Sequence, residues 1–199
     1  MVRMAAHLSN WEEAERHVAV AEKMAPKDPI ILAVRAGLDY REAIRDQNQE
    51  TAQLAVKVSE TLLQDTPDLP AARQVVIEDL LRRQDWIGAL EAIDAGLAVQ
   101  DDQTLYRLRL GVLEQLGRKD EIIVQLKDME QKFPDAGLHQ MLVGRYISEN
   151  RLDEAEAYLR ERATRDTLEG PQTEMELIAF LTRWRGRDVA IAELDQILS

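Results

Sequence analysis

The side chains that could do chemistry in this chain of 199 residues are few and scattered. There is no cysteine, so thiol catalysis, thiolate metal sites and disulfides are excluded. Of the three histidines, His7, His17 and His139, only His17 follows an acidic residue by one helical turn, at Glu13. That spacing predicts a contact on a helix surface. His139 flanks an apolar stripe, so we expect it to be packed or capping rather than a ligand.

The adjacent acids Asp153 and Glu154 could be taken for a catalytic carboxylate pair. They stand in the first turn of a predicted helix, where the helix dipole alone favours acidic residues. The sequence also lacks a GxxxxGK[ST] loop, a GxSxG elbow and an HExxH pair. We therefore expect no catalytic residues, no cofactor and no metal site, and the chain is not predicted to be an enzyme.

Charge argues against a nucleic-acid partner. The chain has 37 acidic and 25 basic residues, a net charge of −12, and acidic residues exceed basic ones in both halves. A phosphate backbone would be repelled by this field. Two arginine clusters are expected to be solvated helix faces: Arg160, Arg162 and Arg165, and Arg183, Arg185 and Arg187.

Membrane insertion is not expected, because no uninterrupted apolar run reaches the roughly 18 residues that a spanning helix needs. The first eight residues also lack the apolar core of a signal peptide. The absence of cysteine does not fix the compartment. The cytoplasm is favoured, and export would need a signal upstream of this sequence.

The elements that would position any site are helices. Apolar residues recur at steps of three and four along the whole chain, as in the stripe of Trp11, Ala14, Val18, Ala21 and Met24. No strand-like alternation appears. About twelve helices of roughly 12–19 residues are predicted, with Asp28 and Asn150 as capping residues and Gly117 as a C-terminal glycine.

One short pattern recurs, a polar or glycine turn followed by a helix start and a small or apolar residue. The last residues of its copies are Ala14, Ala89, Ile122, Ala155 and Ala190. Two consecutive steps are 33 residues and the next is 35. A period near 34 built from two helices is typical of stacked helical hairpins. The copy in the second repeat, placed at Ala55, is about eight residues late, so the helices or loop there must be longer.

The fold class expected is therefore all-α, an α-solenoid of about six antiparallel helix-turn-helix hairpins in one domain spanning residues 1–199, with the first hairpin truncated. The units predicted are roughly 1–28, 29–69, 70–102, 103–135, 136–168 and 169–199.

The residues of the recurring pattern resemble the tetratricopeptide repeat (TPR) family over nearly the whole chain. The first copy fits every position of the family's second helix, with Asn10, Trp11, Glu12, Glu13, Ala14, Val18, Ala21 and Pro26. The fourth unit keeps the spacing with Gly117, Ile122, Leu126, Met129 and Pro134. Two units depart from the pattern: Asp101 and Thr167 replace the closing proline, and Gly96 and Arg162 stand at the small position.

The resemblance implies a right-handed solenoid that serves as a non-catalytic protein–protein interaction scaffold. A peptide or protein would bind in a groove lined by the first helix of each repeat. The family's groove positions, carried over to this sequence, are Gln74, Glu78, Arg82, Arg107, Glu114, Gln140, Ser148, Met175 and Arg183. The asparagines Asn10, Asn48 and Asn150 fall at predicted turns, so a clamp for a C-terminal carboxylate is not expected. The RNA-binding pentatricopeptide alternative needs a basic groove, which the net charge disfavours.

Two alternatives stay open: a regulatory or substrate-presenting segment of a larger protein, and an enzyme with an unrecognised site in the groove. The last predicted helix ends on Ile197 and Leu198 without a polar capping helix. Solenoids need polar ends to remain soluble. This predicts either a section of a longer repeat protein or self-association through the ends.

Overall fold

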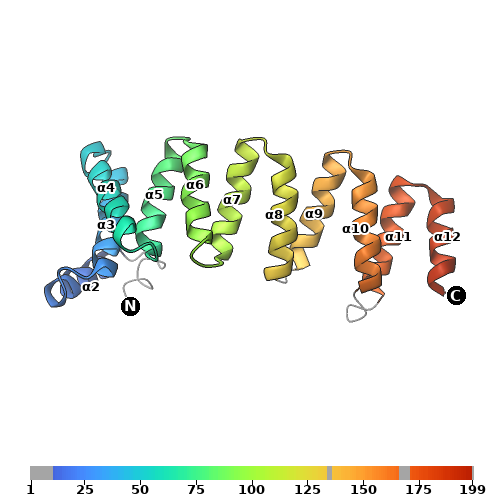
Figure 1. Cartoon of the computed structure of the whole chain (residues 1–199), viewed down its shortest axis with the longest axis horizontal. Coiled ribbons are helices and arrows are strands. Elements are labelled where there is room, and N and C mark those ends of the chain that lie inside the picture. Colours follow the sequence, from blue (N-terminus) through green and yellow to red (C-terminus); the bar gives the residue numbers. More distant parts are fainter. Residues whose placement is uncertain (1–10, 134–135, 166–170, 199) are drawn as a thin grey trace. The chain divides into compact units, whose positions relative to one another are not determined.

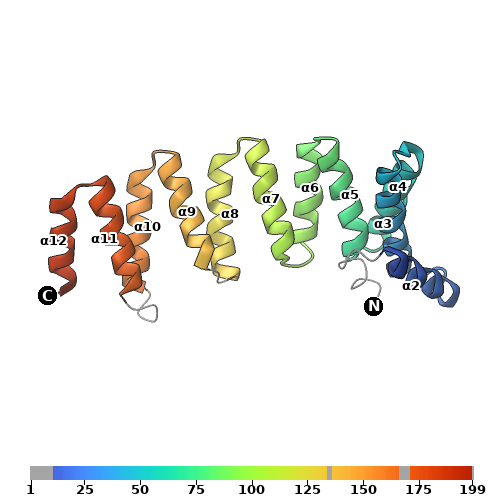
Figure 2. The ribbon, with the colours of Figure 1, turned by 180° about the vertical axis from the view of Figure 1, so that it is seen from behind.

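A computed structural model describes residues 11–133, 136–165 and 171–198 of the chain. Across these residues the protein is all-α, with eleven helices that follow one another along the chain (Figures 1 and 2). The helices are α2 (Trp11–Met24), α3 (Pro29–Arg45), α4 (Gln49–Asp65), α5 (Pro70–Arg82), α6 (Trp86–Leu97), α7 (Gln103–Gln115), α8 (Lys119–Lys132), α9 (Ala136–Ser148), α10 (Leu152–Arg165), α11 (Gln172–Trp184) and α12 (Arg187–Leu198). Three residues of the recurring pattern, Asn10, Pro134 and Thr167, lie outside the described residues, as does His7.

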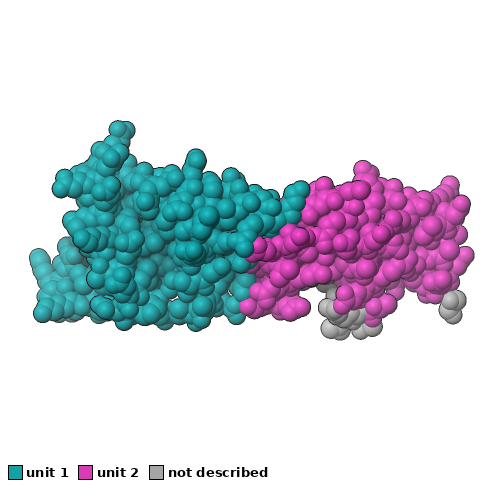
Figure 3. Space-filling model, turned by 45° about the horizontal axis from the view of Figure 1, so that its top comes forward, with its two compact units in different colours: residues 1–119 teal, residues 120–199 magenta. Residues whose placement is uncertain are grey.

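The chain divides into two compact units, residues 1–119 and residues 120–199 (Figure 3). In the first unit each helix from α2 to α7 packs against the next, and α3 also packs against α5. In the second unit α9, α10, α11 and α12 pack in sequence. This serial packing of neighbouring helices confirms the all-α hairpin fold expected from the sequence.

Short polar side chains start several helices by accepting bonds from the free amides of the first turn. The Asp28 carboxylate accepts from the Ile30 amide at 2.8 Å, as predicted, and Asp102 accepts from the Thr104 amide at 2.7 Å. Asn48 and Asp85 cap α4 and α6 in the same way.

The turns between α3 and α4, α5 and α6, α7 and α8, α9 and α10, and α11 and α12 each contain one residue in the left-handed region. These residues are Gln47 (φ 57°), Gln84 (φ 59°), Gly117 (φ 67°), Asn150 (φ 57°) and Gly186 (φ 103°). After the first four, the next amide bonds back to the carbonyl five residues earlier, as from Asp85 to Leu80 at 2.9 Å. This bond closes the preceding helix. Asn150 is therefore a turn residue and the prediction that it caps a helix was wrong, because asparagine tolerates the left-handed conformation and α10 begins two residues later.

The left-handed residue marks the repeat register. In the first four of these turns the fifth residue after it is buried, namely Ala52, Ala89, Ile122 and Ala155. The equivalent residue of the second repeat is thus Ala52, not Ala55. The extra length of that repeat lies in its helices, since α3 and α4 have 17 residues each whereas the others have 12 to 14.

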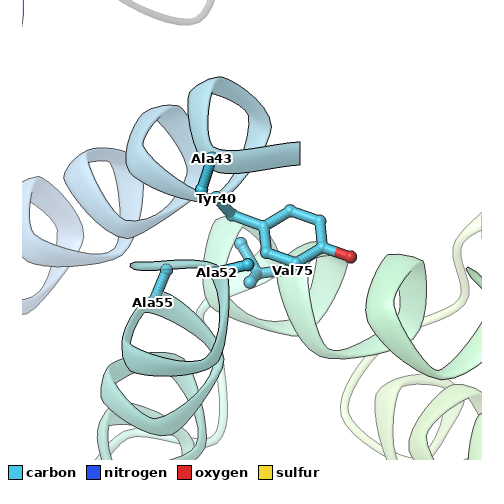
Figure 4. Close-up of a cluster of buried hydrophobic side chains, with 5 residues drawn as sticks. All are labelled: Tyr40, Ala43, Ala52, Ala55 and Val75. Carbon is cyan, nitrogen blue, oxygen red and sulfur yellow. The ribbon is translucent and has the colours of Figure 1, made fainter. Parts of the chain in front are cut away.

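Small residues allow these helices to approach closely. In one core cluster Tyr40 and Ala43 of α3 meet Ala52 and Ala55 of α4 and Val75 of α5 (Figure 4). All five are buried. The alanines occupy little volume, so the Tyr40 ring fills the space where the three helices converge and its hydroxyl points away from the alanines (Figure 4).

Replacing Gln84 by glycine is expected to raise the free energy of unfolding by about 1 kcal/mol, because a side chain in the left-handed region is strained and glycine is not. Gly117→Ala is the reverse control: nothing lies within 4 Å of the added carbon, so only the backbone conformation opposes it. The free energy of unfolding of Gly117→Ala should fall by a similar amount, about 1 kcal/mol. Urea denaturation measures both, and a less stable Gln84→Gly protein would contradict the interpretation.

Candidate functional site

A cavity of about 520 Å3 opens in the first unit on helices α3, α5 and α7. These are the helices that precede the left-handed turns. The segments leading into α5 and α7 and the end of α6 complete its wall. The cavity thus lies on the helices for which the resemblance implies a groove.

The lining combines an apolar floor with a polar rim. Apolar side chains come from all three helices: Val34 and Leu38, Val75 and Leu81, and Leu105 and Leu108. Polar and charged side chains include Arg41, Asp68, Gln74, Glu78, Gln100 and Asp102. An apolar hollow with a few convergent polar groups is the usual composition of a binding site.

Glu78 connects two of the helices across this surface. Its Oε1 accepts from Arg41 Nη2 of α3 at 3.2 Å and from Gln74 Nε2 of its own helix at 2.7 Å. Arg41 and Glu78 also line a smaller hollow of about 240 Å3, together with Tyr40, Ile44 and Arg82. The two hollows share residues, so they form one continuous surface, which we call the α3–α5–α7 groove.

The carboxylate of Asp79 accepts hydrogen bonds from two residues that line the smaller hollow, Tyr40 and Arg82. Asp79 is only 7% exposed, and its Oδ1 accepts from Arg82 Nη2 at 2.9 Å and from the Tyr40 hydroxyl at 3.3 Å. Its Oδ2 lies 2.8 Å from Arg83 Nε. Burial raises the pKa of Tyr40, the hydrogen bond from Arg82 opposes that rise, and the Asp79 charge adds to it. The Arg82 guanidinium is therefore held in place at the rim.

The structure brings three of the nine predicted site residues together. Gln74 and Glu78 line the larger hollow, and Arg82 lines the smaller one. The other six are exposed and line neither hollow: Arg107 and Glu114 on α7, Gln140 and Ser148 on α9, and Met175 and Arg183 on α11.

The residues that α3 contributes were missed. Gly37 and Arg41 line the groove, but the prediction began its inner wall at α5. The register contained the signal: Arg41 precedes Gln47 by six residues, as Glu78 precedes Gln84. Arg73, which also lines the cavity, had no such signal, because the register places no groove residue there.

Two side chains of the second unit that were considered as a ligand or a catalytic acid, His139 and Asp153, instead form contacts between helices and turns. His139 is 6% exposed, and its Nε2 lies 3.3 Å from Glu176 Oε1, which links α9 to α11. Asp153, exposed at the start of α10, pairs with Arg185 of the α11–α12 turn. Within the described ranges, no three or more His, Asp or Glu side chains are placed so that they could hold a metal ion.

The expectation that the arginine clusters are merely solvated was wrong for Arg160, Arg162 and Arg185. Arg160 pairs with Glu156 and Glu193, and Arg185 also pairs with Glu156, at 2.7 Å. Arg162 Nη1 lies 3.2 Å from Glu130 of α8. Burial opposes ionisation of Glu156, but the hydrogen bonds from Arg185 and Arg160 outweigh it and lower the pKa of that carboxyl. These arginines therefore join helices within the second unit.

Arg183 contacts an aromatic ring instead, with its guanidinium carbon 5.5 Å from the centre of the Trp184 ring. Among the helices described, none combines the length and apolarity needed to cross a bilayer.

The sequence matches no known family model and no curated protein. Solved structures are similar to it in fold. TTC0263, a thermophilic TPR protein of Thermus thermophilus, has a TM-score of 0.53 and 21% identity over 90% of this chain and 95% of its own. PilW, a type IV pilus biogenesis factor, has a TM-score of 0.51 and 16% identity over 100% of this chain and 95% of its own.

A third similar structure is a chain of the Naa15/Naa10 complex bound to HypK-THB, with a TM-score of 0.65 and 14% identity. It covers 98% of this chain, which in turn spans only 30% of that one. At these identities the similarity concerns the backbone alone. Over nearly its whole length the chain therefore has the fold of the tetratricopeptide repeat proteins.

Proposed function

We propose that this protein is a non-catalytic scaffold that binds a peptide, or an extended segment of a partner protein, in the α3–α5–α7 groove. The observation that carries the proposal is the apolar hollow with a polar rim on the helices that precede the left-handed turns. The fold adds support, because TPR proteins typically serve in protein interactions and one similar chain was solved within a multiprotein complex.

The dimensions of the groove suit an extended peptide. Helix α5 has 13 residues and is about 20 Å long, a length that about six residues of extended chain would span. Gln74, Glu78 and Arg82 lie along this helix and are the proposed polar contacts. The exposed residues of α7, α9 and α11 that the resemblance assigned to the groove are proposed as contacts of a longer partner.

Filling the hollow should block binding. We expect Gly37→Leu to weaken peptide binding by at least about tenfold, a cost of about 1.4 kcal/mol. The variant should fold, because a carbon added at Gly37 meets only Val75 Cγ2, at 3.8 Å. Peptides selected from a random phage-displayed library against the full chain provide the probe, and fluorescence anisotropy provides the affinity.

The matched control is Gly144→Leu, the same change at a helical glycine with open space around it in the second unit. It should leave the affinity unchanged. If the two variants bind alike, the groove is not the binding surface. Arg82→Ala combined with Arg107→Ala then asks whether the two arginines that the resemblance assigned to the groove contribute, one lining the smaller hollow and the other exposed on α7.

A regulatory or substrate-presenting segment of a larger protein is the second candidate. The observation that favours it is the match to 30% of one chain of a larger complex. A partner enzyme whose rate changes on binding would distinguish this candidate from a simple scaffold.

Self-association is proposed through α12. Ile191 (47% exposed), Leu194 (39%) and Leu198 (76%) recur at three- and four-residue steps and form an uncovered apolar stripe. We expect the mass measured by light scattering to rise with concentration and this rise to disappear in Leu194→Glu. A strict monomer at high concentration would contradict it.

A further inference from the structure

Arg73 of α5 is a buried cation in the wall of the 520 Å3 cavity. It is only 9% exposed, and its Nη2 donates to the backbone carbonyl of Pro67. No carboxylate among the described residues lies within 4.0 Å of it. By contrast, two other arginines at the end of α5 do have a carboxylate partner: Arg82 and Arg83 both pair with Asp79.

This arrangement is unfavourable in the unliganded protein. Burial lowers the pKa of Arg73, and only the charge of Asp68, which forms no ion pair with it, opposes that effect. Asp102, the other carboxylate at this end of the cavity, already accepts two backbone amides at the start of α7. Buried charges in proteins are normally paired with an opposite charge, and here that partner is missing from the described residues.

The fold nevertheless makes room for the arginine. A carbon added at Gly96 of α6 would lie 2.6 Å from Arg73 Cδ and 2.9 Å from its Nε. The side chain can therefore lie across α6 only because residue 96 is glycine. The Pro67 carbonyl then fixes one end of the guanidinium, so its orientation is set before any ligand arrives.

Building on the proposed function, we infer that Arg73 binds an acidic side chain, Asp or Glu, of the peptide in the groove. The carboxylate would pair with the guanidinium inside the cavity, and apolar side chains next to it in the peptide would contact Leu105 and Leu108, which line the same cavity. A C-terminal carboxylate is not the proposed ligand. Asn48, an amide side chain of the kind used to hold a chain end, instead caps α4.

Long-range electrostatics cannot make the groove prefer an acidic peptide over a neutral one. The protein has a net charge of −12, and Asp68, Glu78 and Asp102 also line the cavity, so an acidic peptide is repelled until it reaches Arg73. At 0.15 M salt the long-range part is screened beyond about 8 Å. A measured preference for Glu over Gln would therefore report a local contact.

The test uses blocked peptides and the isotope-labelled full chain in an NMR titration at about 0.15 M salt. The probes are Ac-Ala-Leu-Glu-Leu-Ala-NH2, the same peptide with Gln in place of Glu, and the Gln peptide with a free C-terminal carboxylate. We expect the Glu peptide to bind about tenfold more tightly than the blocked Gln peptide, since a hydrogen-bonded charge pair is stronger than a neutral one. The largest shift should fall on the Arg73 Nε–Hε signal.

Variants separate the contact from a structural role. Arg73→Met should remove the preference for Glu, whereas Lys57→Met, the same charge change at an exposed position of α4, should keep it. If Arg73→Met does not fold, Arg73→Lys replaces it and should reduce the preference.

Equal affinities for Glu and Gln, or tightest binding of the free C-terminus, would overturn the inference about Arg73. Neither result would contradict the proposed function. That function is tested separately, and it is contradicted if Gly37→Leu leaves the binding of selected peptides unchanged.

Discussion

Replacing Leu181 by alanine is expected to lower the free energy of unfolding by about 3 kcal/mol, within the roughly 2–5 kcal/mol seen for leucines in packed cores. Leu181 is fully buried in α11, a helix that packs against both α10 and α12. Truncation removes apolar contact and leaves a cavity that short helices on both sides cannot close. Of the changes considered for this protein, it should have the largest effect on stability.

Met175→Ala on the same helix is the control, because its side chain is 61% exposed and it should cost under about 1 kcal/mol. Urea denaturation measures both losses. Native-state hydrogen exchange shows which helices lose stability. In Leu181→Ala the amides of α10, α11 and α12 should lose protection, since each helix depends on its immediate neighbours. Equal losses from the two variants would contradict the assigned core.

Gly96→Ala is expected to destabilise the protein by about 1–3 kcal/mol, although alanine usually stabilises a helix relative to glycine by about 0.5–1 kcal/mol. The added carbon would lie 2.6 Å from both Arg73 Cδ and Leu105 Cδ1. Both side chains must move, and Arg73 would then lose its bond to the Pro67 carbonyl.

Gly111→Ala provides the comparison, because nothing lies within 4 Å of the added carbon. It should be stabilising, so the two alanine substitutions should have opposite signs in thermal or urea unfolding. Gly96→Ala should also weaken the preference for the Glu peptide by displacing the guanidinium. A Gly96→Ala protein that is as stable as the original and keeps its preference for the Glu peptide would show that the close approach of α6 to Arg73 contributes neither to stability nor to binding.

Much of the fold could be predicted because it depends on local signals. Apolar periodicity, the Asp28 cap and the recurring turn are all visible within a few residues of sequence. The errors came from turn chemistry. Asn150 can either cap a helix or adopt a left-handed turn. Ala52 and Ala55 are both buried in α4, so the apolar pattern could not show which of them is the repeat position, and only the left-handed turn at Gln47 identifies Ala52.

The groove could be predicted only in part. Gln74, Glu78 and Arg82 share one face of a single helix, so register alone brings them together. Arg41 reaches Glu78 across 37 residues of sequence, and that contact depends on how α3 packs against α5. The burial of Arg73 depends on the closeness of α6 at Gly96. Periodicity carries no information about such distances.

The most direct test of the central claim is hydrogen exchange of the full chain with and without a selected peptide. Binding in the groove predicts slower exchange in α3, α5 and the first turns of α7, with α4 unchanged, because α4 contributes no residue to either hollow. Slower exchange confined to α4, or to helices of the second unit, would contradict the claim that this protein holds its partner in the α3–α5–α7 groove.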